Sequence, residues 1–209
     1  MPLGTGLDFL PGLILLAIAL MVSWILRRPW RLALGTAAQP LGLEVRTGPL
    51  GTASAHGYID DLWVEIDRPG VLQGTLNSYT RIRVAPRNEV PIDIYRKTAM
   101  AQLRSAMLGE LIETGDPDLD DAAEIRGDPA CAATMLQKEC RDELVGILLA
   151  PEKVSVKAGT LIWVQMDSVR SPASGKELLD SAQSLINVAR AMHSGSAEDR
   201  LESGVKTDP

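Results

Sequence analysis

An uncharged stretch near the N-terminus constrains this chain more than any other feature. It runs from Phe9 to Leu26, holds eighteen residues without a charged side chain, and is followed at once by Arg27 and Arg28. A helix rises about 1.5 Å per residue, so this run spans most of a hydrocarbon layer about 30 Å thick. The run is apolar on every helical face, which favours lipid over a protein core. The sequence therefore predicts one N-terminal transmembrane helix.

The residues at the end of this stretch predict how the anchor is oriented. Tryptophan favours the headgroup level of a bilayer, and arginine favours the phosphate layer and the cytoplasmic side. The flank that carries these signals consists of Trp24, Arg27, Arg28, Trp30 and Arg31. We expect residues 1–31 to form an anchor in the inner (cytoplasmic) membrane, with the C-terminal domain in the cytoplasm. The lipid bilayer is thus the first expected partner.

Other interpretations of the stretch fit less well. A cleavable signal peptide carries its positive charges before the apolar run, whereas here the only charged side chain ahead of it is Asp8. A twin-arginine signal needs its arginine pair before the apolar core, and the segment Leu32–Ala38 that follows Arg27 and Arg28 is short and weakly apolar. A buried core helix is a further alternative, but it would not need apolar residues on every face.

Composition limits the classes of partner. The 209 residues carry a net charge of −6, with a pI near 5.0, so no overall attraction to nucleic acid is expected. Three juxtamembrane arginines are fewer than the roughly 4–8 clustered basic residues typical of lipid-specific binding, and they read as a topology signal. After the anchor and a polar tail are subtracted, roughly 150 residues are left for one domain, enough for a hydrophobic core.

The two cysteines predict neither a disulfide nor a zinc site. Cys131 and Cys140 lie nine residues apart on one predicted helix, more than about 13 Å by rise alone, which is too far for a disulfide. Two cysteines with only His56 and His193 do not match zinc-ligand spacing. We expect buried free thiols, in keeping with a reducing cytoplasm.

Alternating apolar and polar residues predict a β-rich region after the anchor. Leu62, Val64 and Ile66 face one way, and the residues between and after them face the other, namely Trp63, Glu65 and Asp67. Pro91 suggests that its strand lies at a sheet edge. The expected strands, which turn residues separate into an antiparallel meander and a later hairpin, are Leu43–Arg46, Ala53–Ile59, Leu62–Asp67, Tyr79–Val84, Val90–Tyr95, Ala122–Arg126, Val154–Val156 and Leu161–Met166.

Helical spacing dominates the C-terminal half. Residues 129–150 read as one amphipathic helix capped by Asp128, and the box Ser174 to Glu177 opens a last helix with Gly195 as its C-cap. Residues 97–113 read as a further helix with a weak end. The expected class is α+β: an antiparallel-rich sheet packed with two C-terminal amphipathic helices. We expect a soluble domain at residues 32–194 and a disordered tail at 195–209.

The C-terminal half resembles a group of bacterial single-pass membrane-anchored proteins of unknown activity. The pattern is a Gly-Asp pair, then an aromatic-Asp pair, a short strand, and a helix with an Arg a few residues before a Leu. The residues that carry it are Gly115, Asp116, Leu119, Asp120, Gly127, Asp128, Leu136, Arg141 and Leu144. Leu119 and Ala122 stand where the pattern has larger aromatic residues. The resemblance implies architecture and membrane location, and it implies no catalytic residue.

The acidic turn at residues 115–128 is the one candidate for a cation site. Asp116, Asp118 and Asp120 occupy positions 1, 3 and 5 of a calcium loop. Positions 6 and 12 then hold Asp121 and Gly127, where such a loop needs Gly and Glu. The favoured interpretation is a turn that Asp116 begins, with solvated neighbours. A weak irregular cation site is the alternative, so no metal or cofactor is predicted.

His56 is the one candidate for catalysis. Ser54 lies two residues earlier on the same strand face, so the pair could in principle build a nucleophilic site with a remote carboxylate. A nucleophile elbow of the G-x-S-x-G type is missing from the sequence, and a strand histidine with a structural role is the commoner case. Arg81 and Arg83 read as a solvated strand face that balances Glu65 and Asp67 on a neighbouring strand.

These observations favour a membrane-tethered, non-enzymatic interaction or scaffold domain. Its expected protein partner is another membrane-associated protein, because the anchor raises the effective concentration of the domain at the bilayer. The alternatives are a membrane-anchored hydrolase that uses His56 or the acidic turn, and a small-ligand sensor with a pocket between sheet and helices. The partner, the ligand and the process cannot be read from the residues.

Overall fold

The computed structural model of this chain describes residues 10–48, 52–69, 78–87, 90–97, 111–150, 152–167 and 174–202. Within its helices and strands, not every side chain is included. The predicted helix at residues 97–113 falls largely on 98–110, outside the described residues. Its last part is not helical, because Leu111–Ile112 pair with a neighbouring strand.

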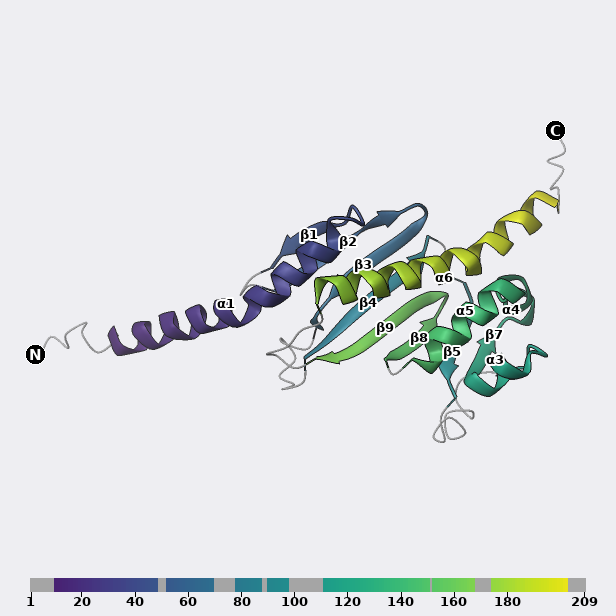
Figure 1. The fold of residues 1–209 in the computed structure, drawn as a ribbon, viewed down its shortest axis with the longest axis horizontal. Helices are drawn as coiled ribbons and strands as arrows, with labels where there is room; N and C mark the ends of the chain where they lie inside the picture. Colours follow the sequence, from purple (N-terminus) through teal and green to yellow (C-terminus); the bar gives the residue numbers. More distant parts are fainter. Residues whose placement is uncertain are drawn as a thin grey trace, which may run out of the picture.

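Nine strands of the described residues form one antiparallel sheet (Figure 1), in the order β1-β2-β3-β4-β9-β8-β5-β7-β6. The strands are β1 Glu44–Thr47, β2 Ala53–Ile59, β3 Leu62–Asp67, β4 Ser78–Pro86, β5 Ile92–Arg96, β6 Leu111–Ile112, β7 Ala123–Gly127, β8 Lys153–Lys157 and β9 Thr160–Asp167. The α+β class with a large antiparallel sheet is confirmed.

A late hairpin joins the two halves of the sheet. The first four strands form the predicted meander, but β4 and β5 do not pair with each other. The hairpin β8–β9 lies between them, with β9 paired to β4 and β8 paired to β5. The edge position predicted from Pro91 is wrong, because β5 lies inside the sheet between β8 and β7. Pro91 precedes the strand, and its carbonyl accepts a hydrogen bond from the Asp128 backbone.

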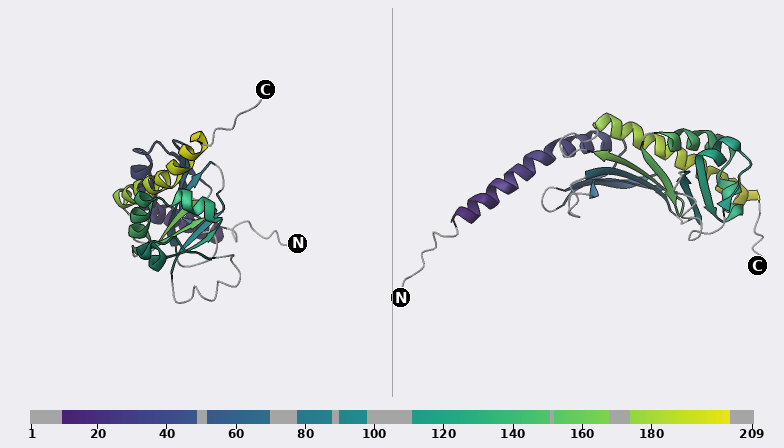
Figure 2. Two further views of the ribbon diagram at one scale, coloured as in Figure 1. Left: turned by 90° about the vertical axis from the view of Figure 1, so that its right-hand side faces the viewer. Right: turned by 90° about the horizontal axis from the view of Figure 1, so that it is seen from below.

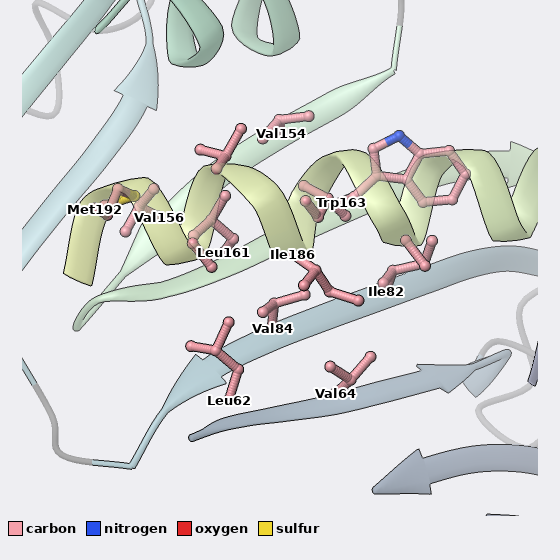
Figure 3. Close-up of a cluster of buried hydrophobic side chains, with 14 of the residues drawn as sticks. Leu62, Val64, Ile82, Val84, Val154, Val156, Leu161, Trp163, Ile186 and Met192 are labelled. Carbon is pink, nitrogen blue, oxygen red and sulfur yellow. The ribbon is translucent and has the colours of Figure 1, made fainter. Parts of the chain in front are cut away.

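Helices cover one side of this sheet, which arches beneath them (Figure 2). The elements on this side are α1 Leu10–Ala38, α4 Pro129–Met135, α5 Lys138–Leu149 and α6 Gly175–Glu202. Strand residues that point toward the helices alternate with residues that point away, and Leu62, Val64 and Ile66 are all buried as predicted. Figure 3 shows Leu62 and Val64 of β3 on the side of the sheet where Ile186 and Met192 of α6 lie.

The capping box predicted at Ser174 is confirmed, and the predicted end of α6 is wrong. The Ser174 backbone N–H donates to Glu177 Oε2 at 2.7 Å, and the Glu177 backbone N–H donates to Ser174 Oγ at 3.2 Å. The helix continues past Gly195 to Glu202. A glycine inside a helix costs only about 1 kcal/mol relative to alanine, and the residues after it are mostly good helix formers.

The single helix predicted at residues 129–150 is two helices. Leu136 leaves helical geometry (φ −99°, ψ 54°) and lies fully buried, and Gln137 is extended before α5 begins. Leu136 and Gln137 thus separate α4 from α5. Cys131 and Cys140 consequently lie on different helices, both as free thiols, with Cys140 buried and Cys131 half-buried.

A short helix replaces the predicted acidic turn. This helix, α3 Pro117–Ala122, follows Asp116, whose carboxylate accepts hydrogen bonds from the first turn. Proline at the first helical position and an aspartate before it are standard N-terminal signals, so the turn that Asp116 begins continues into a helix. Leu119 of α3 is fully buried and fixes the helix on the domain.

The helix α1 is continuous across the predicted boundary between anchor and domain. Its described side chains from Pro11 to Pro29 are exposed, and burial begins at Trp30. From there the helix packs on β2 and on the start of α6. A Cβ on Gly175 would lie 2.6 Å from Thr36 Cβ and 2.9 Å from the Ala33 carbonyl, so only glycine allows this close approach. The expected boundary at residue 31 therefore falls inside one continuous helix, and burial begins at Trp30, just before it.

Candidate functional site

In the described part of the chain, no helix covers the other face of the sheet (Figure 2). We call this surface the open face. Two rows of charged and polar residues cross β1 to β4 on it. One row consists of Glu44, His56, Glu65 and Arg83, and the next contains Arg46 opposite Ser54 and Asp67 opposite Arg81.

Two ion pairs neutralise the middle of the open face. Arg81 donates from Nε to Asp67 Oδ1 at 2.9 Å and from Nη2 to Asp67 Oδ2 at 2.6 Å, and Arg83 donates to Glu65 Oε2. These hydrogen bonds to the Asp67 carboxylate raise the pKa of the Arg81 guanidinium. The predicted balance of these arginines against Glu65 and Asp67 is confirmed. Because each charge has an opposite neighbour, the middle of this face has little net attraction for an ion.

An aromatic patch lies beside these pairs and consists of His56, Tyr58 and Trp63. The Tyr58 and Trp63 rings meet edge to face at 5.0 Å between centroids, and the His56 and Trp63 rings are 5.3 Å apart. Tyr58 is 65% exposed although its ring is large and mostly apolar. Exposed aromatic residues that are held in place by neighbours are typical of interface hot spots.

The aromatic patch borders a small cavity at the turn between β2 and β3. The cavity measures about 260 Å³ and is lined by Tyr58, Asp60, Asp61 and Arg87. A volume of this size is at the lower limit for a small-molecule site, which is typically about 300–1,000 Å³. The patch therefore fits a contact surface better than a ligand pocket.

The structure places His56 against Trp63 and not in a catalytic arrangement with Ser54. Among the described side chains, no hydrogen bond joins Ser54 to His56. A nucleophile and its general base need such contact, at about 2.6–3.2 Å, in at least one state of an enzyme. The open face thus brings together the residues named for a hydrolase without forming a nucleophile–base pair.

Two of the three acidic candidates near α3, Asp116 and Asp120, bind backbone groups of the surrounding turn. Asp116 Oδ1 accepts from the backbone N–H groups of Asp118 (3.1 Å) and Leu119 (3.3 Å). Asp120 accepts from Thr114 N (3.0 Å), Thr114 Oγ1 (2.8 Å) and Gly115 N (3.1 Å). Burial acts to raise the pKa of Asp120, but these hydrogen bonds outweigh it and hold the pKa below its ordinary value. Asp118 is exposed at the start of the helix.

A cavity of about 460 Å³ lies between α3 and α5. It is lined by Asp116, Asp118, Asp121, Ala122, Asp142, Val145 and Leu149. The sequence did not predict the contribution of Asp142, which comes from a different helix; its only signal was a polar position off the apolar stripe of α5. Within the described ranges, no set of three or more His, Cys, Asp or Glu side chains is arranged to hold a metal ion.

The predicted membrane flank divides into two parts. Arg28 is exposed and Arg31 is half-buried, whereas the side chains of Trp24 and Arg27 lie outside those that the structure describes. Trp30 is not at an exposed position: it is 3% exposed, and its Nε1 donates to the Ala53 carbonyl at 3.0 Å. The prediction of a headgroup position for Trp30 is wrong, because its ring packs into the domain core.

The helices of the described residues include none with the length and apolar character needed to cross a membrane. The N-terminal half of α1 nevertheless exposes several large apolar side chains to at least 48% of their area. These are Leu13, Ile14, Leu15, Leu16, Ile18, Met21, Val22 and Ile25.

A buried ion pair in β7 was missed by the sequence analysis. Arg126 Nη2 lies 3.5 Å from Glu124 Oε2, and the two residues are 3% and 9% exposed. They lie two residues apart and therefore on the same face of the strand, opposite Ile125. A sequence rarely shows whether such a pair of charges is buried or solvated, because burial of both faces of a strand depends on segments that are distant in the chain.

Comparisons of this chain with protein-family models, with curated proteins and with solved structures give no match. The resemblance to bacterial membrane-anchored proteins therefore stays a prediction.

Proposed function

We propose that this chain is a single-pass, membrane-tethered interaction protein without catalytic activity, whose sheet domain faces the cytoplasm. The observation that carries the proposal is the change in exposure along α1. Described side chains before Trp30 are exposed and largely apolar. From Trp30 onward, side chains buried in the domain core alternate with more exposed ones.

The exposed half of α1 needs an apolar environment. Soluble monomers rarely expose contiguous apolar patches larger than a few hundred Å². Here the exposed side chains occupy successive helix positions from Leu13 to Leu16, so they point in all directions around the axis and a single partner face cannot cover them. A hydrocarbon layer covers all sides at once, and the uncharged run Phe9–Leu26 is about 27 Å long as a helix.

The charge distribution supports a cytoplasmic domain. Basic residues next to a membrane helix favour the cytoplasmic side, and here they follow the apolar run while no Lys or Arg precedes it. A tether at this position holds the domain near the bilayer surface, so partners that are also membrane-bound are encountered at a raised effective concentration.

The aromatic patch is the part of the domain that best fits a protein partner. Tyr58 and Trp63 supply rigid, amphipathic contact area, and the neighbouring ion pairs supply a polar rim that is already neutralised. The arrangement therefore favours contact with a protein surface over binding of an ion.

Membrane fractionation of the full chain tests the anchor. A charged residue at the centre of a membrane helix costs roughly 2.5–3.5 kcal/mol on insertion scales, so the double variant Leu15→Lys/Ile18→Lys should lose about 5–7 kcal/mol of insertion free energy. We expect the wild-type chain to resist extraction by alkaline carbonate and the double variant to be released. Gln39→Lys, at an exposed position just after α1, is the matched control and should fractionate as the wild type. A wild-type chain that is soluble without detergent would refute the tether.

Site-specific crosslinking in membranes tests the interaction surface. A photoreactive residue in place of Tyr58 should give a discrete adduct that disappears when Trp63→Ala is added. The same residue in place of Leu149, which is exposed on α5, is the control and should give none. Equal adducts from both positions would mean that the aromatic patch is not the preferred contact. Protease accessibility in inverted vesicles reports on which side the domain lies.

A further inference from the structure

The fold adds basic residues to the point where α1 enters the domain. Arg68, at the end of β3, lies with its guanidinium carbon 5.7 Å from the centre of the Trp30 ring. Trp30 itself is fixed by its hydrogen bond to Ala53 of β2. Arg68 is 37 positions after Arg31 in the sequence and is brought to the same end of the molecule by the sheet.

Arg46 lies at the same end of the sheet. It is on β1, one residue before the strand ends at Thr47, and Thr47 pairs with Ala53 beside Trp30. Arg46 contacts Glu44 at 3.1 Å, and the two side chains are 65% and 64% exposed. Solvent screens an ion pair this exposed, so the guanidinium can exchange its partner for another anion.

We name these residues the arginine collar: Arg28, Arg31, Arg46 and Arg68. Two acidic groups of the neighbouring strands already contact arginines: Glu44 pairs with Arg46, and Asp67 accepts from Arg81. The segments 49–51 and 70–77, which link the strands at this end, contain no charged residue in the sequence. The turn at the other end of β2 and β3 holds Asp60 and Asp61. Although the whole chain has a net charge of −6, basic residues therefore gather where the exposed apolar part of α1 meets the domain.

The depth of the collar matches that of lipid phosphates if α1 is inserted. From Leu26, the last residue of the uncharged run, the helix rises about 6 Å to Trp30. The polar headgroup region is roughly 5–8 Å thick on each side of the hydrocarbon layer. Arg68, which lies over Trp30, would then be at the level of the headgroups, where arginine forks bind phosphate oxygens well.

We infer that the arginine collar binds the headgroups of anionic phospholipids and so holds the domain against the membrane surface. This inference rests on the proposed membrane tether and specifies its lipid partner. The four arginines of the collar reach the range of about 4–8 basic residues that is typical of anionic-lipid recognition. Arg46 and Arg68 are the members that only the fold supplies.

Lipid selectivity of the full chain in bilayers tests the inference. The chain is reconstituted into vesicles of phosphatidylcholine with a small fraction of phosphatidylglycerol, and spin-labelled forms of each lipid report which one is preferred at the protein surface. We expect selectivity for phosphatidylglycerol that weakens at about 1 M salt, because exposed charges are screened within about 3 Å there. Arg68→Gln should reduce the selectivity by up to about fivefold, the effect of one basic residue near an anionic surface.

Three matched variants separate charge from packing and position. Arg68→Lys keeps the charge without the planar group over Trp30 and should retain most of the selectivity, which Arg68→Gln should not. Arg46→Gln should lower it as well. Arg87→Gln, an exposed position at the far end of β4, should leave it unchanged. Thermal melts of each variant identify any that fail to fold.

The outcomes distinguish the inference from the tether. A chain that inserts but shows equal preference for both lipids, or a selectivity that Arg68→Gln and Arg46→Gln do not alter, overturns the collar alone. An equal loss on Arg87→Gln also overturns it, because the effect would then be one of overall charge. A chain that does not associate with vesicles of either composition refutes the tether itself.

Discussion

Substitution of Trp30 should separate the two roles of α1. Trp30 is 3% exposed, packs in the core and donates a hydrogen bond to the Ala53 carbonyl. Removal of a buried tryptophan side chain costs roughly 3–5 kcal/mol, a large part of a typical total of about 5–15 kcal/mol. For a domain of this size, we expect Trp30→Ala to lower the Tm by about 6–20 °C.

A matched control lies three turns earlier on the same helix. Ile18 is 53% exposed, so Ile18→Ala should change the free energy of unfolding by less than about 0.5 kcal/mol. Trp30→Phe keeps a ring in the core but removes the donor to the Ala53 carbonyl, and should cost about 1–3 kcal/mol. Near-ultraviolet circular dichroism of the full chain in detergent, followed with temperature, measures all three.

The result also bears on the interpretation of α1. If Trp30→Ala left the melting temperature unchanged while it altered membrane association, Trp30 would be a membrane residue and the helix would not enter the core at this point. If Ile18→Ala destabilised the domain as much as Trp30→Ala, the exposed half of α1 would have a packing partner in the folded chain.

Three further perturbations test other parts of the structure. Gly127→Ala should destabilise the domain by roughly 2–4 kcal/mol in chemical denaturation, because Gly127 has φ +126° and a Cβ there would lie 2.0 Å from the Pro91 carbonyl oxygen; an unchanged midpoint would contradict this geometry. Burial lowers the pKa of His193, so the folded state favours the neutral ring. The neutral ring contributes stability above the unfolded pKa of about 6.5, and this stability is lost as the pH falls through the pKa of the folded state, which is lower. Melts between pH 5 and 7.5 should therefore show a pH dependence that His193→Gln reduces, and equal slopes for both chains would count against it. Burial raises the pKa of the Cys140 thiol to about 12, so native Cys140 should resist alkylation by iodoacetamide at pH 8 and react on unfolding, as mass spectrometry would show; fast native labelling would contradict its burial.

Local patterns in the sequence predicted most of the strands and helix starts. The bounds of β2 and β3 agree with the expected ranges, and the capping box at Ser174 has its expected hydrogen bonds. These features depend on residues close together in the chain, such as alternation in a strand or a side chain that bonds to the next helical turn. The pairing of Arg81 and Arg83 with Glu65 and Asp67 was also predicted from the sequence, because successive strands of a meander lie side by side.

Features that depend on distant segments were not predicted. The break between α4 and α5 falls at Leu136 and Gln137, and neither glycine nor proline stands at or beside these positions. Trp30 has the same local signals as a headgroup tryptophan, and only its contact with Ala53, 23 residues later, places it in the core. The burial of Glu124 and Arg126 likewise depends on neighbours that local patterns do not identify.

Among the candidate site residues, the aspartates near α3 show why sequence reasoning found positions but not roles. Asp116 and Asp120 bind backbone groups within six residues of themselves, which is a local interaction of a kind that an acidic turn allows. Asp116 lines a cavity together with Asp142, and that meeting depends on the packing of α3 against α5. The aromatic patch could be inferred in part, since Trp63 was expected to point away from Leu62 and Val64. Its partner Tyr58 required the register of β2 with β3.

The position of the β8–β9 hairpin has a consequence for synthesis of the chain. β4 and β5 are made early, yet the strands that pair with their inner edges come from residues 153–167, near the C-terminus. At about 5–20 residues per second, a ribosome needs roughly 4–16 s to make the approximately 80 residues between the ends of β4 and β9. During that interval two strand edges lack their final neighbours, and such edges readily pair with other chains. A nascent chain already held at a bilayer would pass this interval separated from its copies on neighbouring ribosomes.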